Sequence, residues 1–111
     1  MEMIRILMSN INKPGIGHRT ALFEAVAYDK IDTVRRFLEK RADPNIPDGN
    51  GTTCLMNAAS CNNEAMVKLL ISHKADIHFK DNFGDDAAQY ARAQGHEQLA
   101  ESLEKLKAES K

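Results

Sequence analysis

The chain has 111 residues, which is enough for one domain and too few for two of ordinary size. Its 15 basic and 16 acidic residues give a net charge of −1, without the basic excess that binding to nucleic acid requires. Hydrophobic residues at 42% and charged residues at 28% are ordinary for a soluble protein, and no run approaches the roughly 18 apolar residues of a membrane span.

Residues 1–9, MEMIRILMS, are too short and too mixed for a secretory signal, and the repeat register predicts a short helix there. Residues 9–12 lie 33 positions before residues 42–45, and Ile4 lies 33 positions before Phe37. We therefore expect a lone second helix, a half-repeat that covers the first full unit. Its apolar side chains leave open whether it folds back, pairs in a dimer or lacks a preceding element; they are Met1, Met3, Ile6 and Met8.

The segments that follow repeat with a period of 33 residues. Small residues recur as small residues, large apolar residues mostly recur as apolar ones, and Asp recurs as Asp. The equivalent positions form six sets: Thr20 and Thr53; Leu22 and Leu55; Ala25, Ala58 and Ala91; Val34, Val67 and Ala100; Phe37, Leu70 and Leu103; and Asp48 and Asp81. A period of this length predicts a stacked array of supersecondary units.

Within one unit the pattern predicts helix, turn, helix and loop. Thr53 precedes a run of helix-forming residues and can cap its first turn, and Asn62 with Asn63 interrupts the run. Met66, Val67, Leu70 and Ile71 then form one apolar stripe on a second helix, and residues 74–84 are turn-forming. Neither helix is long enough to be stable alone, so both must pack against neighbouring units as in a solenoid.

The last unit departs from the others in a way that suits the end of a stack. It lacks the capping Thr, and it places Glu104 where its predecessors have Leu38 and Ile71. A terminal repeat needs a polar outer face. We therefore expect a C-terminal capping unit up to residue 107 and a frayed tail at 108–111.

These motifs resemble the ankyrin repeat, a 33-residue unit of two antiparallel helices and a β-turn finger. Its Thr-Pro-Leu-His-x-Ala opening is present as TALFEA and TCLMNA, its lead-in as DGNGTT, and its closing as RADPN and KADIH. The resemblance covers about residues 15–105. It implies an all-α solenoid with β-turn fingers, divided into a half-repeat (1–14), two repeats (15–47 and 48–80) and a cap (81–107).

Several positions differ from the family pattern. The proline is replaced by Ala21 and Cys54, and the histidine by Phe23 and Met56, which removes the loop-to-loop hydrogen bonds that this histidine makes. The glycine before Ala-Asp is Arg41 and Lys74. If the backbone is left-handed there, each non-glycine residue costs on the order of 1 kcal/mol.

Two histidines stand at turn positions of the same pattern. His96 follows Gly95 as in the family's Gly-His turn, which implies a structural role. His18 stands where the lead-in glycine belongs, and we expect it on the surface.

The sequence predicts no catalytic, metal or cofactor site. Cys54 and Cys61 with His73 and His78 do not have zinc-finger spacing, and seven helical residues separate the cysteines by roughly 10 Å. Cys54 near a helix N-terminus has two interpretations, a reactive thiol or a small residue in place of proline, and the second is favoured. Cys61 is expected to be exposed. Two cysteines without a signal peptide favour free thiols in a reducing, cytoplasmic location.

What remains is recognition of a partner protein, which the family resemblance places on the concave surface of fingers and first helices. Tyr28 and Phe83 are the expected anchors, because aromatic residues dominate interface energetics. Phe83 either projects from its finger or packs back over a helix, and partial burial is the favoured expectation for Tyr28. The full candidate set is Ile16, Arg19, Tyr28, Asn50, Thr52, Ser60, Cys61, Lys80, Asn82, Phe83, Asp85 and Gln94.

The sequence therefore predicts a non-catalytic protein-binding module, an adaptor or an inhibitor, with no nucleic acid, membrane or cofactor partner. We expect a monomer. Two other hypotheses stay open: a redox-responsive or metal-binding protein that uses Cys54 and Cys61, and a self-assembling protein that pairs through the N-terminal helix.

Overall fold

The computed structural model describes residues 12–109, and the helix expected at 1–9 lies outside this range. Residues 12–109 contain six α-helices, one 3-10 helix and no strand. The elements are η1 (Ile16–His18), α2 (Ala21–Ala27), α3 (Ile31–Glu39), α4 (Cys54–Ser60), α5 (Glu64–Ser72), α6 (Ala87–Ala93) and α7 (Glu97–Glu109). The last helix extends two residues past the domain end expected at residue 107.

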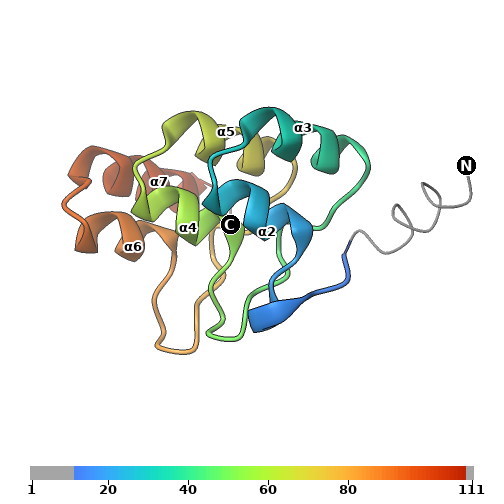
Figure 1. Cartoon of the computed structure of the whole chain (residues 1–111). Coiled ribbons are helices and arrows are strands. Elements are labelled where there is room, and N and C mark those ends of the chain that lie inside the picture. Colours follow the sequence, from blue (N-terminus) through green and yellow to red (C-terminus); the bar gives the residue numbers. More distant parts are fainter. Residues whose placement is uncertain (1–11, 110–111) are drawn as a thin grey trace, which may run out of the picture.

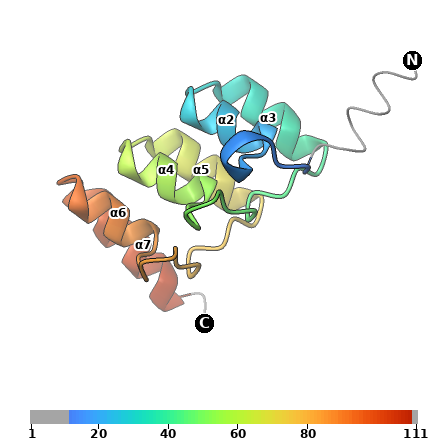
Figure 2. The same ribbon diagram turned by 60° about the horizontal axis from the view of Figure 1, so that its bottom comes forward.

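The helices form three antiparallel pairs that stack in chain order (Figure 2). The first helices, α2, α4 and α6, make one row, and the second helices, α3, α5 and α7, make another (Figure 1). Three loops extend from the first row away from the second; we call them finger 1 (residues 12–20), finger 2 (45–53) and finger 3 (78–86) (Figure 1). This is the all-α stacked architecture that the 33-residue period predicts.

Each first helix begins at a capped residue. Thr20 and Thr53 accept hydrogen bonds through Oγ1 from the N–H groups of Phe23 (3.1 Å) and Met56 (3.4 Å). The third unit lacks this threonine, but Asp86 occupies the same register and accepts from Gln89 N–H at 3.0 Å. A different residue type therefore keeps the same cap.

The backbone repeats even where the residues change. Left-handed residues recur at 18, 51 and 84 in the fingers, at 29, 62 and 95 between paired helices, and at 41 and 74 after the second helices. Arg41 and Lys74 have φ values of 69° and 71°, so both adopt the conformation that favours glycine. The stack imposes this conformation on residues that do not prefer it.

The core lies between the two rows of helices. Leu22, Leu55 and Leu70 are each no more than 1% exposed, as their apolar register requires. One register position on the second helices, shared by residues 38, 71 and 104, changes from buried Leu38 to partly buried Ile71 and exposed Glu104. The outer side of α7 is therefore polar at this position, and the capping role expected for the third unit stays a prediction.

No helix among residues 12–109 combines the length and the apolar character needed to cross a membrane.

Candidate functional site

Fingers 2 and 3 are each organised around one aspartate. Asp48 Oδ1 accepts hydrogen bonds from Asn50 N–H at 2.9 Å and Thr52 N–H at 3.0 Å. Asp81 Oδ1 does the same with Phe83 N–H and Asp85 N–H, both at 2.9 Å. A carboxylate that holds two amides fixes the finger in one conformation, because both donors would otherwise need water.

Neighbouring fingers are also joined to one another. Gly49 N–H donates to Gly17 C=O at 2.9 Å, and one register later Asn82 N–H donates to Asn50 C=O at 3.2 Å. The fingers therefore form a continuous row along one edge of the stack (Figure 2). We call this edge the finger row.

Tyr90 on α6 contacts two neighbouring fingers of the finger row through its hydroxyl. Its hydroxyl donates to Asp81 Oδ2 and lies 3.0 Å from Thr52 Oγ1 on the preceding finger. Burial and the hydrogen bond to Asp81 raise the pKa of the Tyr90 phenol. Burial acts to raise the pKa of Asp81, but the bonds from Tyr90 and three backbone amides outweigh it and hold that pKa below its ordinary value. No motif in the sequence indicated this role for Tyr90.

Most of the predicted finger residues lie at the surface. Ile16 is 98% exposed and Phe83 is 80% exposed, so the phenyl ring projects rather than packing back. Thr52 differs, because it is half-buried and held by Tyr90. The remaining exposed members of the row are Asn50, Lys80, Asn82 and Asp85.

Arg19 is exposed but is not free. Its Nη1 lies 3.2 Å from Glu24 Oε1, and its guanidinium sits 4.9 Å from the centre of the Phe23 ring. A cation above an aromatic face is attracted to it. These two contacts hold the Arg19 side chain against the start of α2.

A second set of predicted residues lies at the C-terminal ends of the first helices. Tyr28, Cys61 and Gln94 cap α2, α4 and α6, one per unit at a spacing of 33 residues, and all three are exposed. Partial burial was favoured for Tyr28, and this was wrong: its side chain is 70% exposed. We call these three positions the helix-end row. A seven-residue helix places it about 10 Å from the fingers.

Ser60, predicted for the binding surface, has a structural contact. It is half-buried, and its carbonyl oxygen lies 3.1 Å from His96 Nε2. His96 thus joins α4 to the turn before α7, which is the structural role the Gly-His motif implies.

The two cysteines differ sharply in environment. Cys54 is 1% exposed, and burial raises the pKa of its thiol to about 12, so the reactive-thiol interpretation of this residue is wrong. Cys61 is exposed, as expected. Residues 12–109 contain no group of three or more His, Cys, Asp or Glu side chains arranged to hold a metal ion.

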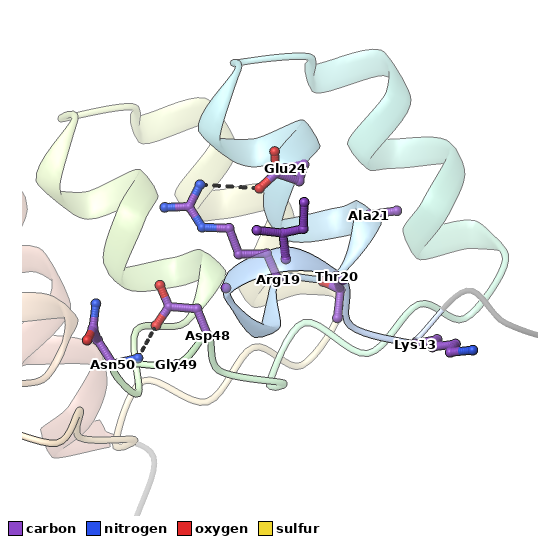
Figure 3. Close-up of a pocket in the computed structure, with 11 residues that line it drawn as sticks. Lys13, Arg19, Thr20, Ala21, Glu24, Asp48, Gly49 and Asn50 are labelled. Atoms are coloured by element: carbon purple, nitrogen blue, oxygen red, sulfur yellow. Dashed lines mark hydrogen bonds and ion pairs between the residues drawn. The ribbon is translucent and has the colours of Figure 1, made fainter.

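A cleft with a volume of about 910 Å³ adjoins finger 1 (Figure 3). Ile16, Arg19 and Asn50 line it among the predicted residues, but Gly15 and Asp48 line it as well and were not predicted. The sequence does contain an indication that finger 1 differs, because Gly15 lies 33 positions before Asp48 and so occupies the position that is aspartate in fingers 2 and 3.

Comparison with known proteins identifies the repeats. Residues 22–110 match the family model for ankyrin repeats (3 copies). The chain belongs to the ankyrin-repeat family. Ankyrin repeats are generally protein–protein interaction modules and are typically non-catalytic.

Several ankyrin-repeat relatives share part of the chain. An ankyrin repeat-containing protein of Treponema pallidum is 33% identical over 73 residues, covering 66% of this chain and 24% of the relative. An ankyrin repeat protein of Acanthamoeba polyphaga mimivirus is 33% identical over 104 residues, covering 74% and 18%. A neurogenic locus notch homolog protein 1 of Xenopus tropicalis is 38% identical over 56 residues, covering 50% and 2%. The chain thus spans less than a quarter of each of these proteins.

Proposed function

We propose that this ankyrin-repeat chain is a non-catalytic module that binds a partner protein across the finger row and the helix-end row. It acts as an adaptor or as an inhibitor of that partner. One observation carries the proposal: of the four large hydrophobic side chains exposed in residues 12–109, three lie on these rows. They are Ile16, Phe83 and Tyr28; the fourth, Leu106, is on α7.

These apolar side chains suit an interface because they stand on a rigid base. Finger 3 is held by Asp81 and tied to finger 2, so Phe83 needs little ordering when a partner covers it. Aromatic side chains that become fully desolvated are the usual energetic centres of interfaces. Tyr28 adds a second centre with a hydroxyl that can stay at the wet rim.

A non-catalytic role is consistent with how the polar groups of this surface are used. The Thr52 hydroxyl and the Asp81 carboxylate are both bonded to Tyr90, and the Arg19 guanidinium is paired with Glu24. These bonds support the surface rather than leave a nucleophile beside a base. A cytoplasmic location belongs to the same proposal and is supported by two free cysteines.

The test is affinity capture from a lysate of the source cell. Wild type is compared with the double variant Tyr28→Ala/Phe83→Ala, and Leu106→Ala serves as the control that removes an exposed apolar side chain elsewhere. Circular dichroism first establishes that all three are folded. A protein captured by wild type and by the control, but lost by the double variant, is the expected result.

Equal capture by all three proteins would contradict the assignment of the surface. Capture of nothing, together with a mass above the monomer at high micromolar concentration, would instead favour the self-assembly hypothesis. The N-terminal segment that this hypothesis invokes lies outside the described residues.

A further inference from the structure

Finger 1 lacks the carboxylate around which the other two fingers are built. The three fingers close with equivalent backbone bonds: residue 15 N–H donates to residue 19 C=O at 2.7 Å, 48 to 52 at 2.9 Å, and 81 to 85 at 2.9 Å. The side chain inside the loop is an aspartate in fingers 2 and 3 and is absent in finger 1, where the residue is Gly15.

The amides that this carboxylate would hold are poorly satisfied in finger 1. Gly17 and Arg19 are the register equivalents of Asn50 and Thr52, whose amides donate to Asp48. Among the described residues Gly17 N–H has no acceptor, and Arg19 N–H makes only a long 3.4 Å bond to Ile16 C=O. Gly17 also has a φ of 70°, whereas Asn50 is not left-handed. Finger 1 forms the short helix η1 at the position where fingers 2 and 3 close around their aspartates.

The cleft of about 910 Å³ opens at this position (Figure 3). Residues 12–23 contain two cations, Lys13 and Arg19, and no acidic residue. Two carboxylates also line the cleft: Glu24, whose Oε1 pairs with Arg19 Nη1 at 3.2 Å, and Asp48 on finger 2, which stands one finger away. Asp48 and Asp81 already coexist at that same one-finger separation, so the spacing tolerates two carboxylates.

We propose that finger 1 binds a carboxylate from an Asp or Glu side chain of the partner protein, which replaces the aspartate missing at Gly15. The carboxylate accepts hydrogen bonds from the Gly17 and Arg19 amides, beside Lys13, which lines the same cleft. Charged acceptors form the stronger class of hydrogen bond with backbone amides. This inference rests on the proposed function and adds to it the chemical class of one partner group.

The first test supplies the carboxylate from the chain itself. Gly15 has φ −105° and ψ −139°, and a Cβ there would meet only Arg19 O at 3.7 Å, so Gly15→Ala is the control that carries the same backbone without a carboxylate. We expect Gly15→Asp to melt higher than Gly15→Ala by about 4 °C or more, because it satisfies two amides in the folded state. Equal melting temperatures would overturn the proposal, since the amides would then not form a carboxylate site.

The second test adds the carboxylate from outside. The probe is the peptide acetyl-Ser-Gly-Asp-Gly-Ser-amide, with the Asn peptide of otherwise identical sequence as control, titrated at fixed ionic strength while amide NMR shifts are recorded. We expect saturable shifts of the Gly17 and Arg19 amides with the Asp peptide in wild type and in Gly15→Ala. Gly15→Asp should lose the response. Equal shifts with the Asn peptide, an undiminished response in Gly15→Asp, or no saturable response in wild type would each overturn the proposal.

These tests separate the inference from the proposed function. Partner capture that is lost in the Tyr28→Ala/Phe83→Ala variant and undiminished in Gly15→Asp would support the binding surface and reject the carboxylate site. Capture that is lost in Gly15→Asp and retained in Gly15→Ala would support both.

Discussion

The second helices of the three units begin in the same register but end differently. α3 and α5 each have nine residues, and the chain turns left-handed two residues after each ends, at Arg41 and at Lys74. The equivalent residue of the third unit is Lys107, and there α7 continues as a helix to Glu109. Three basic residues in one register thus adopt two conformations.

We infer from this difference that the following unit, more than the local sequence, ends α3 and α5. After α5 the chain must turn so that Ala75 is buried and finger 3 can form. Lys107, by contrast, lies inside α7, and its Nζ reaches Asp86 Oδ2 at 2.5 Å. A residue that carries strain in an internal unit therefore makes a stabilising contact in the terminal one.

The strongest test of this comparison removes the same core position from each unit. Leu70 on α5 and Leu103 on α7 are 33 residues apart and 0% and 1% exposed. We expect Leu70→Ala to lower the free energy of unfolding by about 3 kcal/mol and Leu103→Ala by about 2 kcal/mol, because an internal repeat packs against two neighbours. Urea unfolding followed by circular dichroism measures both, and a larger loss for Leu103→Ala would contradict the assignment of α7 as the cap.

The next test concerns the cap of α6, which in the last unit is also an ion-pair partner. Asp86→Ala removes the cap and the Lys107 contact together, and we expect a loss of about 2 kcal/mol in unfolding free energy. Thr53→Ala removes only a cap, with an expected loss of about 1 kcal/mol. Equal losses in urea unfolding would mean that the Lys107 contact adds nothing.

The same aspartate makes stability depend on pH. Burial acts to raise the pKa of Asp86, but hydrogen bonds from Lys107 and Gln89 N–H outweigh it and hold the pKa below the ordinary value. The resulting stability is present above the unfolded-state pKa of about 3.9 and is lost as pH falls through the lower folded-state value. Asp86→Asn should therefore show a shallower loss than wild type when unfolding is measured from pH 6 to pH 2.5. Parallel curves would exclude Asp86 as a contributor.

Much of the fold follows from the sequence because the repeat period transfers information between units. The Thr53 cap, the turn at Asn62 and the polar position at Glu104 were all predicted from register. The exposure of Tyr28 was not, because register gives which helix end a residue occupies but not how much its neighbours cover it. The cap at Asp86 could have been predicted, since Asp followed three residues later by Gln is a capping-box pattern.

The proposed binding surface was harder to predict from the sequence, because its distinctive features are contacts between units. Tyr90 reaches two fingers, which neither its own repeat nor its hydropathy indicates. The cleft lies where Gly15 replaces the aspartate of the other fingers, and this replacement is visible only when the three fingers are compared in register.

Glycine substitutions should distinguish the two helix ends by the sign of their effect. Lys74→Gly relieves a left-handed non-glycine residue, so we expect a gain in unfolding free energy of about 1 kcal/mol. Lys107→Gly places glycine inside a helix, with an expected loss of about 1 kcal/mol relative to Lys107→Ala. The alanine variant accounts for the lost Asp86 contact. Effects of the same sign at both positions would contradict the idea that the following unit sets the conformation.

The smallest expected effect concerns the exposed ion pairs that replace apolar packing on the outer side of the last unit. Arg92 on α6 contacts Glu104 on α7 through two bonds of 2.8 and 3.0 Å, and Glu97 at 3.5 Å. These side chains are substantially exposed, and such pairs are screened by salt. We expect Glu104→Gln to lower the melting temperature slightly at low ionic strength and not measurably in 1 M NaCl.

If Glu104→Leu, which restores the apolar character of Leu38, leaves the protein monomeric in sedimentation analysis, then the charge at this position is not needed to end the stack. Association of Glu104→Leu would show that the polar face of α7 prevents a further unit from adding.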